Sequence, residues 1–80
     1  MLKVVSVTPL EDYILSVGFD NGEVRKKDIK PLLEKPVFSP LKDISLFNSA
    51  FIQYGAITWR DSAGNEIDLC PDNVYMSSEV

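Results

Sequence analysis

The carboxylates near the end of the sequence come closest to a chemical motif. Asp68 and Asp72 flank Pro71, a residue that suits the opening of a helix. Two carboxylates near a helix start could hold a divalent cation, because hard cations prefer oxygen ligands. The simpler interpretation places Asp72 at the positive end of its own helix and leaves Asp68 as an exposed strand residue or a partner of Arg60. We adopt the simpler interpretation and expect neither a metal ion nor a cofactor.

Other catalytic chemistry has little support in the sequence. Acid–base catalysis usually needs a histidine or a carboxylate in an apolar pocket, and the chain contains no histidine. Cys70 stands between Leu69 and Pro71, and neither neighbour supplies the base or the positive charge that activates a thiol. We therefore expect a protein that is not an enzyme.

Charge and composition narrow the partners and the compartment. The formal net charge is −4, which opposes sequence-independent binding to a nucleic-acid backbone. The densest basic run, Arg25-Lys26-Lys27, is more simply the solvated face of a strand. No stretch approaches the roughly 20 apolar residues that span a bilayer, and a single cysteine is typical of a reducing compartment. We expect a cytoplasmic protein with no direct contact to nucleic acid or membrane.

Strands dominate the first part of a chain that we expect to form one domain over residues 1–80. Leu2 to Thr8 is rich in β-branched residues and predicts a strand that Pro9 ends. Tyr13 to Phe19 alternates large apolar with small residues, which is typical of a half-buried strand. Asn21-Gly22 is a strong hairpin signal. A two-residue turn there would pair Phe19 with Val24 and Ile14 with Ile29.

The middle of the chain is a partly helical crossover. Prolines at positions 31, 36 and 40 leave room only for single helical turns. We expect one such turn over residues 31–34 and a second that starts at Ser39, with Ser39 as its cap. Ile44, Leu46 and Phe47 are then expected to point back to the sheet.

The C-terminal third predicts one more strand, a second hairpin and a helix. Residues 50–54 form the strand, residues 57–60 and 66–70 form the hairpin, and the helix opens at Pro71. Trp59 and Tyr75 are candidate anchors for a partner, because aromatic residues often dominate interfaces. The apolar periodicity around Trp59 favours core packing instead. The expected fold class is α+β: a small, mainly antiparallel sheet of two hairpins with short helical turns in the crossover and at the C-terminus.

The order of particular residues resembles the bacterial family catalogued as domain of unknown function 2442. The pattern spans nearly the whole chain, and it departs from relatives in its longer turn between Arg60 and Ile67. Its elements are Pro9-Leu10, Phe19-Asp20-x-Gly22, Asp28, Pro31-Leu32-Leu33, Phe38, Pro40-Leu41, Leu46-Phe47, Gly55-x-Ile57-x-Trp59 and Asp68-Leu69-x-Pro71-Asp72-x-x-Tyr75. The resemblance marks Asp20, Gly22, Trp59, Asp68, Pro71, Asp72 and Tyr75 as candidate interaction or family-motif residues.

The resemblance also implies two functional hypotheses. Relatives are often encoded beside another small protein, as in a toxin–antitoxin pair, which implies an interaction module that is the antitoxin-like or regulatory member of such a pair. The alternative is a ligand-sensing or transcription-regulatory domain that acts near DNA through a partner, because the family is similar to a domain fused to a helix-turn-helix. In both cases we expect a protein partner, and the resemblance implies the product of a neighbouring gene. A thin core and open sheet edges further favour a homodimer.

Overall fold

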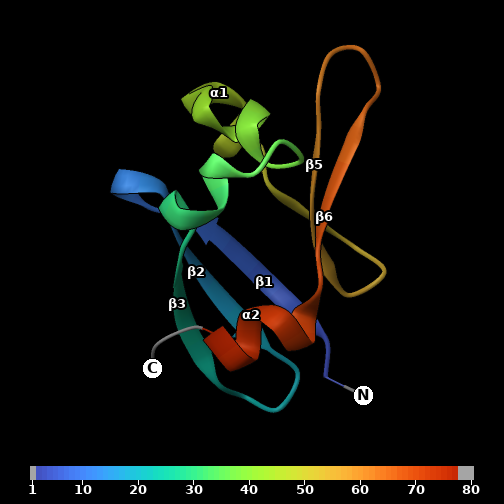
Figure 1. Ribbon diagram of the computed structural model, residues 1–80. Helices are drawn as coiled ribbons and strands as arrows, with labels where there is room; N and C mark the ends of the chain where they lie inside the picture. Colours follow the sequence, from blue (N-terminus) through green and yellow to red (C-terminus); the bar gives the residue numbers. More distant parts are fainter. Residues whose placement is uncertain (1, 78–80) are drawn as a thin grey trace.

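Two three-stranded antiparallel sheets make up most of the computed structural model, which describes residues 2–77 (Figure 1). The predicted α+β class is confirmed, with the strands divided between two sheets. The first sheet has the order β1-β2-β3 and the second the order β4-β5-β6. The elements are β1 (Val4–Pro9), the 3-10 helix η1 (Glu11–Tyr13), β2 (Ile14–Phe19), β3 (Val24–Asp28), the 3-10 helices η2 (Lys30–Glu34) and η3 (Ser39–Lys42), α1 (Ile44–Phe47), β4 (Phe51–Gln53), β5 (Ala56–Arg60), β6 (Glu66–Leu69) and α2 (Pro71–Ser77).

The first sheet buries the face that the alternation of β2 predicts. Leu15, Val17 and Phe19 are buried on its inner side. Ser6 and Ser16 lie on the outer side, where Ser6 pairs with Gly18 across the β1–β2 ladder. A Cβ atom on Gly18 would lie 2.2 Å from the Ser6 Oγ. A larger residue at position 18 would therefore require the Ser6 hydroxyl to rotate away.

The hairpin between β2 and β3 exists, but its predicted register is wrong by one residue. The structure pairs Gly18 with Val24 and Ile14 with Asp28. The loop has three residues instead of two, and Gly22 takes the left-handed position with φ of 90°. Asn21 accepts a hydrogen bond from the Glu23 amide at 3.0 Å. Because Asn21 stabilises the turn through its side chain, Gly22 alone supplies the positive φ.

The crossover contains the short helical turns that its prolines predict, with two corrections. Ser39 does not cap η3; its hydroxyl donates to the Pro36 carbonyl at 3.0 Å. Asp43 is the residue that caps a helix, because it accepts from the Ser45 amide at the start of α1. Phe47 is fully buried, as predicted, whereas Ile44 remains 47% exposed and does not point into the core. One helical turn cannot bury side chains on all of its sides.

The predicted second hairpin is confirmed as the β5–β6 pair. Trp59 lies opposite Ile67 and Ile57 opposite Leu69, and all four side chains are buried. The Trp59 indole Nε1 donates to the Phe47 carbonyl at 3.1 Å, which ties β5 to α1. Trp59 is therefore a core residue, as its periodicity predicts.

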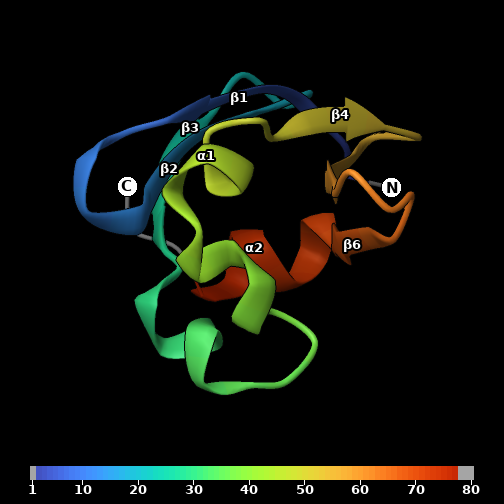
Figure 2. The ribbon, with the colours of Figure 1, turned by 90° about the horizontal axis from the view of Figure 1, so that it is seen from above.

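The two sheets meet through the start of β1 and enclose a shared core. The Val4 amide donates to the Gly55 carbonyl, between β4 and β5, at 2.8 Å. Figure 2 shows α1 and α2 on the concave side of β1–β3, with the second sheet beside them. Val74 of α2 is fully buried there. Within residues 2–77, none of the helices has the length and hydrophobicity that crossing a bilayer requires.

Candidate functional site

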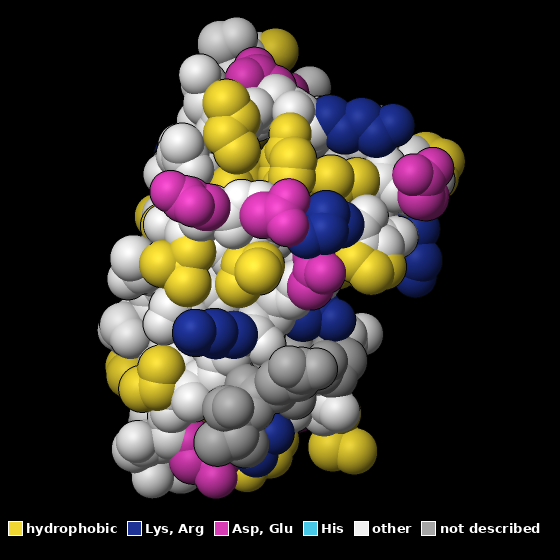
Figure 3. All heavy atoms as spheres, turned by 90° about the vertical axis from the view of Figure 1, so that its left-hand side faces the viewer, with side chains coloured by type: hydrophobic (Ala, Val, Ile, Leu, Met, Phe, Trp, Pro, Cys, Tyr) yellow, Lys and Arg dark blue, Asp and Glu magenta, His cyan; other side chains and the backbone are white. Residues whose placement is uncertain are grey.

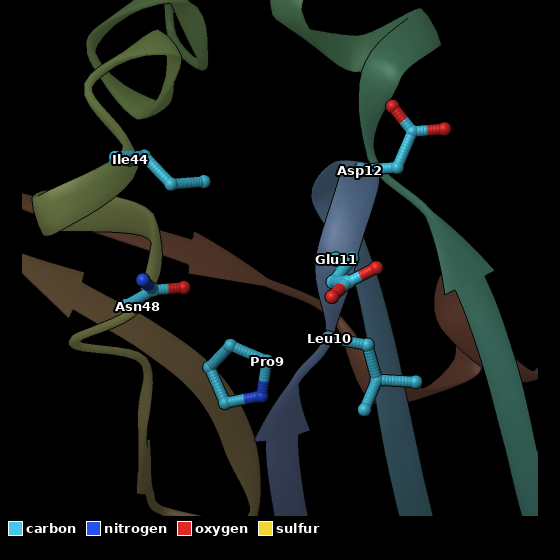
Figure 4. Close-up of a pocket in the computed structure, with 6 residues that line it drawn as sticks. All are labelled: Pro9, Leu10, Glu11, Asp12, Ile44 and Asn48. Atoms are coloured by element: carbon cyan, nitrogen blue, oxygen red, sulfur yellow. The ribbon is translucent and has the colours of Figure 1, made fainter.

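A surface depression of about 700 Å³ lies between the β1–β2 turn and α1. We call it the corner groove. Figure 4 shows Ile44 and Asn48 on one side and the turn residues on the other. Its lining residues are Pro9, Leu10, Glu11, Asp12, Ile44 and Asn48.

The turn that forms one wall holds two adjacent residues in a strained backbone conformation. Asp12 and Tyr13 have φ of 63° and 60°, which is the left-handed region. Each such residue costs roughly 1–2 kcal/mol when it is not glycine. Backbone hydrogen bonds on both sides offset this cost, from Leu10 to Ile14 at 2.7 Å and from Ile29 to Tyr13 at 2.8 Å. The left-handed conformation of these two residues changes the chain direction sharply and leaves Leu10 and Glu11 at the surface.

Side chains fix the same turn against the rest of the fold. The Tyr13 hydroxyl donates to the Lys42 carbonyl at the end of η3. Its ring packs edge-to-face on Phe47, with 5.2 Å between ring centroids. The Lys30 ammonium donates to the Asp12 carbonyl at 2.8 Å and to its carboxylate at 2.9 Å. The wall of the groove is therefore preorganised, because contacts from three elements determine its shape.

The groove combines exposed apolar side chains with an acidic rim. Leu10 and Ile44 retain 36% and 47% of their accessible surface. Lys30 bridges two carboxylates, those of Asp12 and Asp28, and the hydrogen bond to Asp12 raises the pKa of Lys30 above its usual value. Within residues 2–77, Glu11 forms no salt bridge. The rim therefore carries more negative than positive charge.

The structure does not gather the carboxylates that the sequence offered as cation ligands. Asp68 is exposed on β6 opposite Thr58, while Asp72 lies in the first turn of α2. No group of three or more metal-binding side chains occurs in the described part of the chain. Pro71 opens α2, and Cys70 immediately before it is exposed.

Tyr75 belongs to a second, self-contained cluster on the inner side of β3. Its ring packs edge-to-face on Phe19 at 5.2 Å, and the Arg25 guanidinium lies 3.9 Å from its centroid. Arg25 also pairs with Glu23 at 3.2 Å. The hydrogen bond from Tyr75, and then the contacts of Arg25, lower the pKa of Glu23. This cluster fastens α2 to the first sheet, so Tyr75 has a structural role.

The basic run of β3 is divided between the two faces of its strand. Arg25 is half-buried beneath Tyr75, and Lys27 lies opposite Leu15 in the β2–β3 ladder, so both point to the inner face. Burial lowers the pKa of Lys27, and Lys26 is the exposed member of the run. A continuous basic patch for a phosphate backbone does not arise at β3.

Asp20 and Gly22 shape the first hairpin. The Asp20 amide donates to the Lys3 carbonyl at 2.9 Å, and its carboxylate accepts from the Lys3 amide.

None of the predicted site residues lines the corner groove. Its sequence signals are Pro9-Leu10, which belongs to the family pattern, and the apolar residues Leu10 and Ile44 at positions that a turn and a helix start would expose. Strain at Asp12 and Tyr13 gives no sequence signal.

A small two-sheet α+β domain with a preorganised surface groove is the class of protein that these features define. The chain belongs to the family described as protein of unknown function (DUF2442), whose model matches residues 4–79. Neither the curated proteins nor the solved structures compared with this chain gave a match.

Proposed function

We propose that this protein is a non-catalytic, cytoplasmic interaction module, the antitoxin-like or regulatory member of a bacterial two-gene pair. The corner groove is the observation that carries the proposal. Its apolar residues Leu10 and Ile44 stay exposed although the thin core would gain from burying them, at about 25 cal/mol per Å². A partner that covers them gains that free energy instead.

The backbone strain at the groove supports the same conclusion. Residues held in sparsely populated conformations concentrate at functional sites, where the surrounding structure determines them. Asp12 and Tyr13 are such residues, and contacts with Lys30, Phe47 and the Lys42 carbonyl hold them. A rigid wall lowers the conformational entropy that a partner loses on binding.

Co-purification with the neighbouring gene product tests the proposal. The tagged wild-type chain is co-expressed with that protein and compared with the variant Ile44→Glu. Val37→Glu is the matched control, because Val37 is 66% exposed outside the groove. We expect the wild type and the control to retain the partner in stoichiometric amount, and Ile44→Glu to lose most of it. The proposal is wrong if the wild type retains nothing and the neighbouring protein is harmless when expressed alone.

A further inference from the structure

We propose that the corner groove binds a basic segment of the partner, with one apolar side chain against Pro9 and Ile44 and lysine or arginine residues beside it. This inference rests on the proposed function and adds the chemistry of the partner. The two walls come from elements far apart in sequence, β1–η1 and α1. The space between them suits a side chain that enters from outside.

The apolar part of the recognition follows from the lining of the groove. Ile44 projects from the first position of α1 toward the turn, and Pro9 adds a half-buried ring between the walls, whereas the Leu10 side chain points away from α1. Asn48 supplies an amide on the α1 side that can hydrogen-bond to a peptide backbone. A small set of apolar side chains with a few polar groups is the usual composition of a recognition pocket.

The charge of the rim selects the flanking residues. Glu11 is exposed and forms no salt bridge with another residue of the described range, and the single ammonium of Lys30 serves both Asp12 and Asp28. On the α1 side, exposed Lys42 is followed at once by exposed Asp43. Figure 3 shows this face of the molecule, with acidic side chains around a basic one across its middle and apolar side chains above and below them. An acidic rim on a chain of net charge −4 attracts a basic partner and accelerates the encounter.

A second copy of this chain does not have the required chemistry. At the groove, the acidic rim would face another chain of net charge −4, which offers it no net electrostatic attraction. The densest basic run cannot serve as the ligand, because Arg25 stacks on Tyr75 and Lys27 lies beside Leu15 on the inner face. A partner of different sequence is therefore the occupant.

Nuclear magnetic resonance on the full ¹⁵N-labelled chain tests the inference with defined probes. Three short capped peptides share a Leu-Leu centre and are flanked by lysines, glutamates or serines. We expect the lysine peptide to shift the amide signals of Leu10, Glu11, Asp12, Ile44 and Asn48 in a saturable way. The variant Glu11→Lys should weaken that binding by about fivefold, the effect of roughly 1 kcal/mol from one reversed charge. Glu34→Lys makes the same change of charge at an exposed residue of η2 that does not line the groove, and it should leave the affinity unchanged.

Each other outcome overturns a defined part of the inference. Equal binding of the three peptides removes the role of charge and leaves the apolar groove. Shifts confined to other residues, or none at millimolar peptide, exclude the groove as the site. Groove signals that move with protein concentration alone identify a second copy as the occupant. If Ile44→Glu still co-purifies with the neighbouring protein, the interaction function stands and the groove is not its surface.

Discussion

At the scale of single residues, three non-glycine residues within 2–77 adopt a left-handed backbone conformation, and two of these three gain contacts that hold it. Asp12 and Tyr13 are held by Lys30 and by the Lys42 carbonyl. Tyr54 has φ of 55° in the turn before Gly55, and its side chain is 96% exposed. Packing within the fold therefore does not offset the strain at Tyr54.

Replacing Tyr54 with asparagine should stabilise the fold. Asparagine tolerates positive φ better than tyrosine and is favoured in two-residue hairpin turns. We expect Tyr54→Asn to raise the free energy of unfolding by about 0.5–1 kcal/mol, measured by urea denaturation. Tyr54→Phe keeps the strain and should change little. A clear loss of stability in Tyr54→Asn would show that the tyrosine makes a stabilising contact.

Trp59 is the residue whose replacement should cost most. Trp59→Phe removes the indole donor to the Phe47 carbonyl and leaves unfilled space beside a fully buried ring. The unsatisfied acceptor and the lost volume together should lower the free energy of unfolding by about 2–3 kcal/mol. The midpoint of chemical denaturation measures this change. A loss below about 0.5 kcal/mol would contradict the role of Trp59 as the link between β5 and α1.

At the scale of elements, the strained turn and the end of η3 act as one unit through Tyr13. The variant Tyr13→Phe keeps the ring on Phe47 but loses the hydrogen bond to the Lys42 carbonyl. We expect it to lower the free energy of unfolding by about 1 kcal/mol. Hydrogen exchange at the Leu10 and Ile29 amides should accelerate more than at the Trp59 amide. Uniform acceleration would mean that the turn opens only with the whole fold.

The two hairpins show how far sequence determines pairing. The shared face of β5 and β6 was predictable, because Ile57 and Trp59 alternate with polar residues in one strand and Ile67 and Leu69 in the other. In the β2–β3 hairpin the return strand is mostly charged, so the apolar pattern does not fix the register. The turn then determines the register. The turn in which Asn21 adopts positive φ and the turn in which its side chain forms a hydrogen bond differ little in free energy.

The candidate site was less predictable than the fold. The corner groove depends on the approach of residues 9–12 to α1, which the sequence separates by β2, β3 and the proline-rich crossover. Sequence patterns instead directed attention to Trp59 and Tyr75, whose size suits an interface and equally suits a core. Burial of Trp59 and the stacking of Arg25 on Tyr75 decide between those roles only in three dimensions.

At the scale of the whole molecule, acid should destabilise the fold. The pKa values of Glu23, Asp61 and Glu66 are lowered, by Tyr75 and Arg25, by the Asn65 amide, and by Arg60 respectively. A carboxylate with a lower pKa in the folded state stabilises that state above its unfolded pKa, and this contribution is lost as pH falls through the folded value. Thermal melts should therefore be flat from neutral pH to about pH 5 and decline below it. Glu66→Gln should reduce the slope, whereas Glu34→Gln, at an exposed residue of η2, should not.

The assembly of the protein stays a prediction at the same scale. Sheet edges at β3 and β6 can pair with a second copy, although Lys26 gives β3 some protection. We expect a dimer of this kind to leave the corner groove open. Light scattering at high protein concentration measures the mass, and a monomer there would exclude the dimer.

The backbone hydrogen bond between Val4 and Gly55 joins the sheet that is translated first to the sheet that is translated last, and this order has a consequence for folding during synthesis. Strands β1–β3 are translated first, and the face formed by Leu15, Val17 and Phe19 is then without the elements that cover it. The nascent chain presents this apolar face until β5, β6 and α2 have been made, and such surfaces are prone to aggregation. Premature termination before β5 would release a fragment with an exposed apolar face, which would aggregate or be degraded by the cell's proteases. A folded product therefore requires translation through β5, β6 and α2.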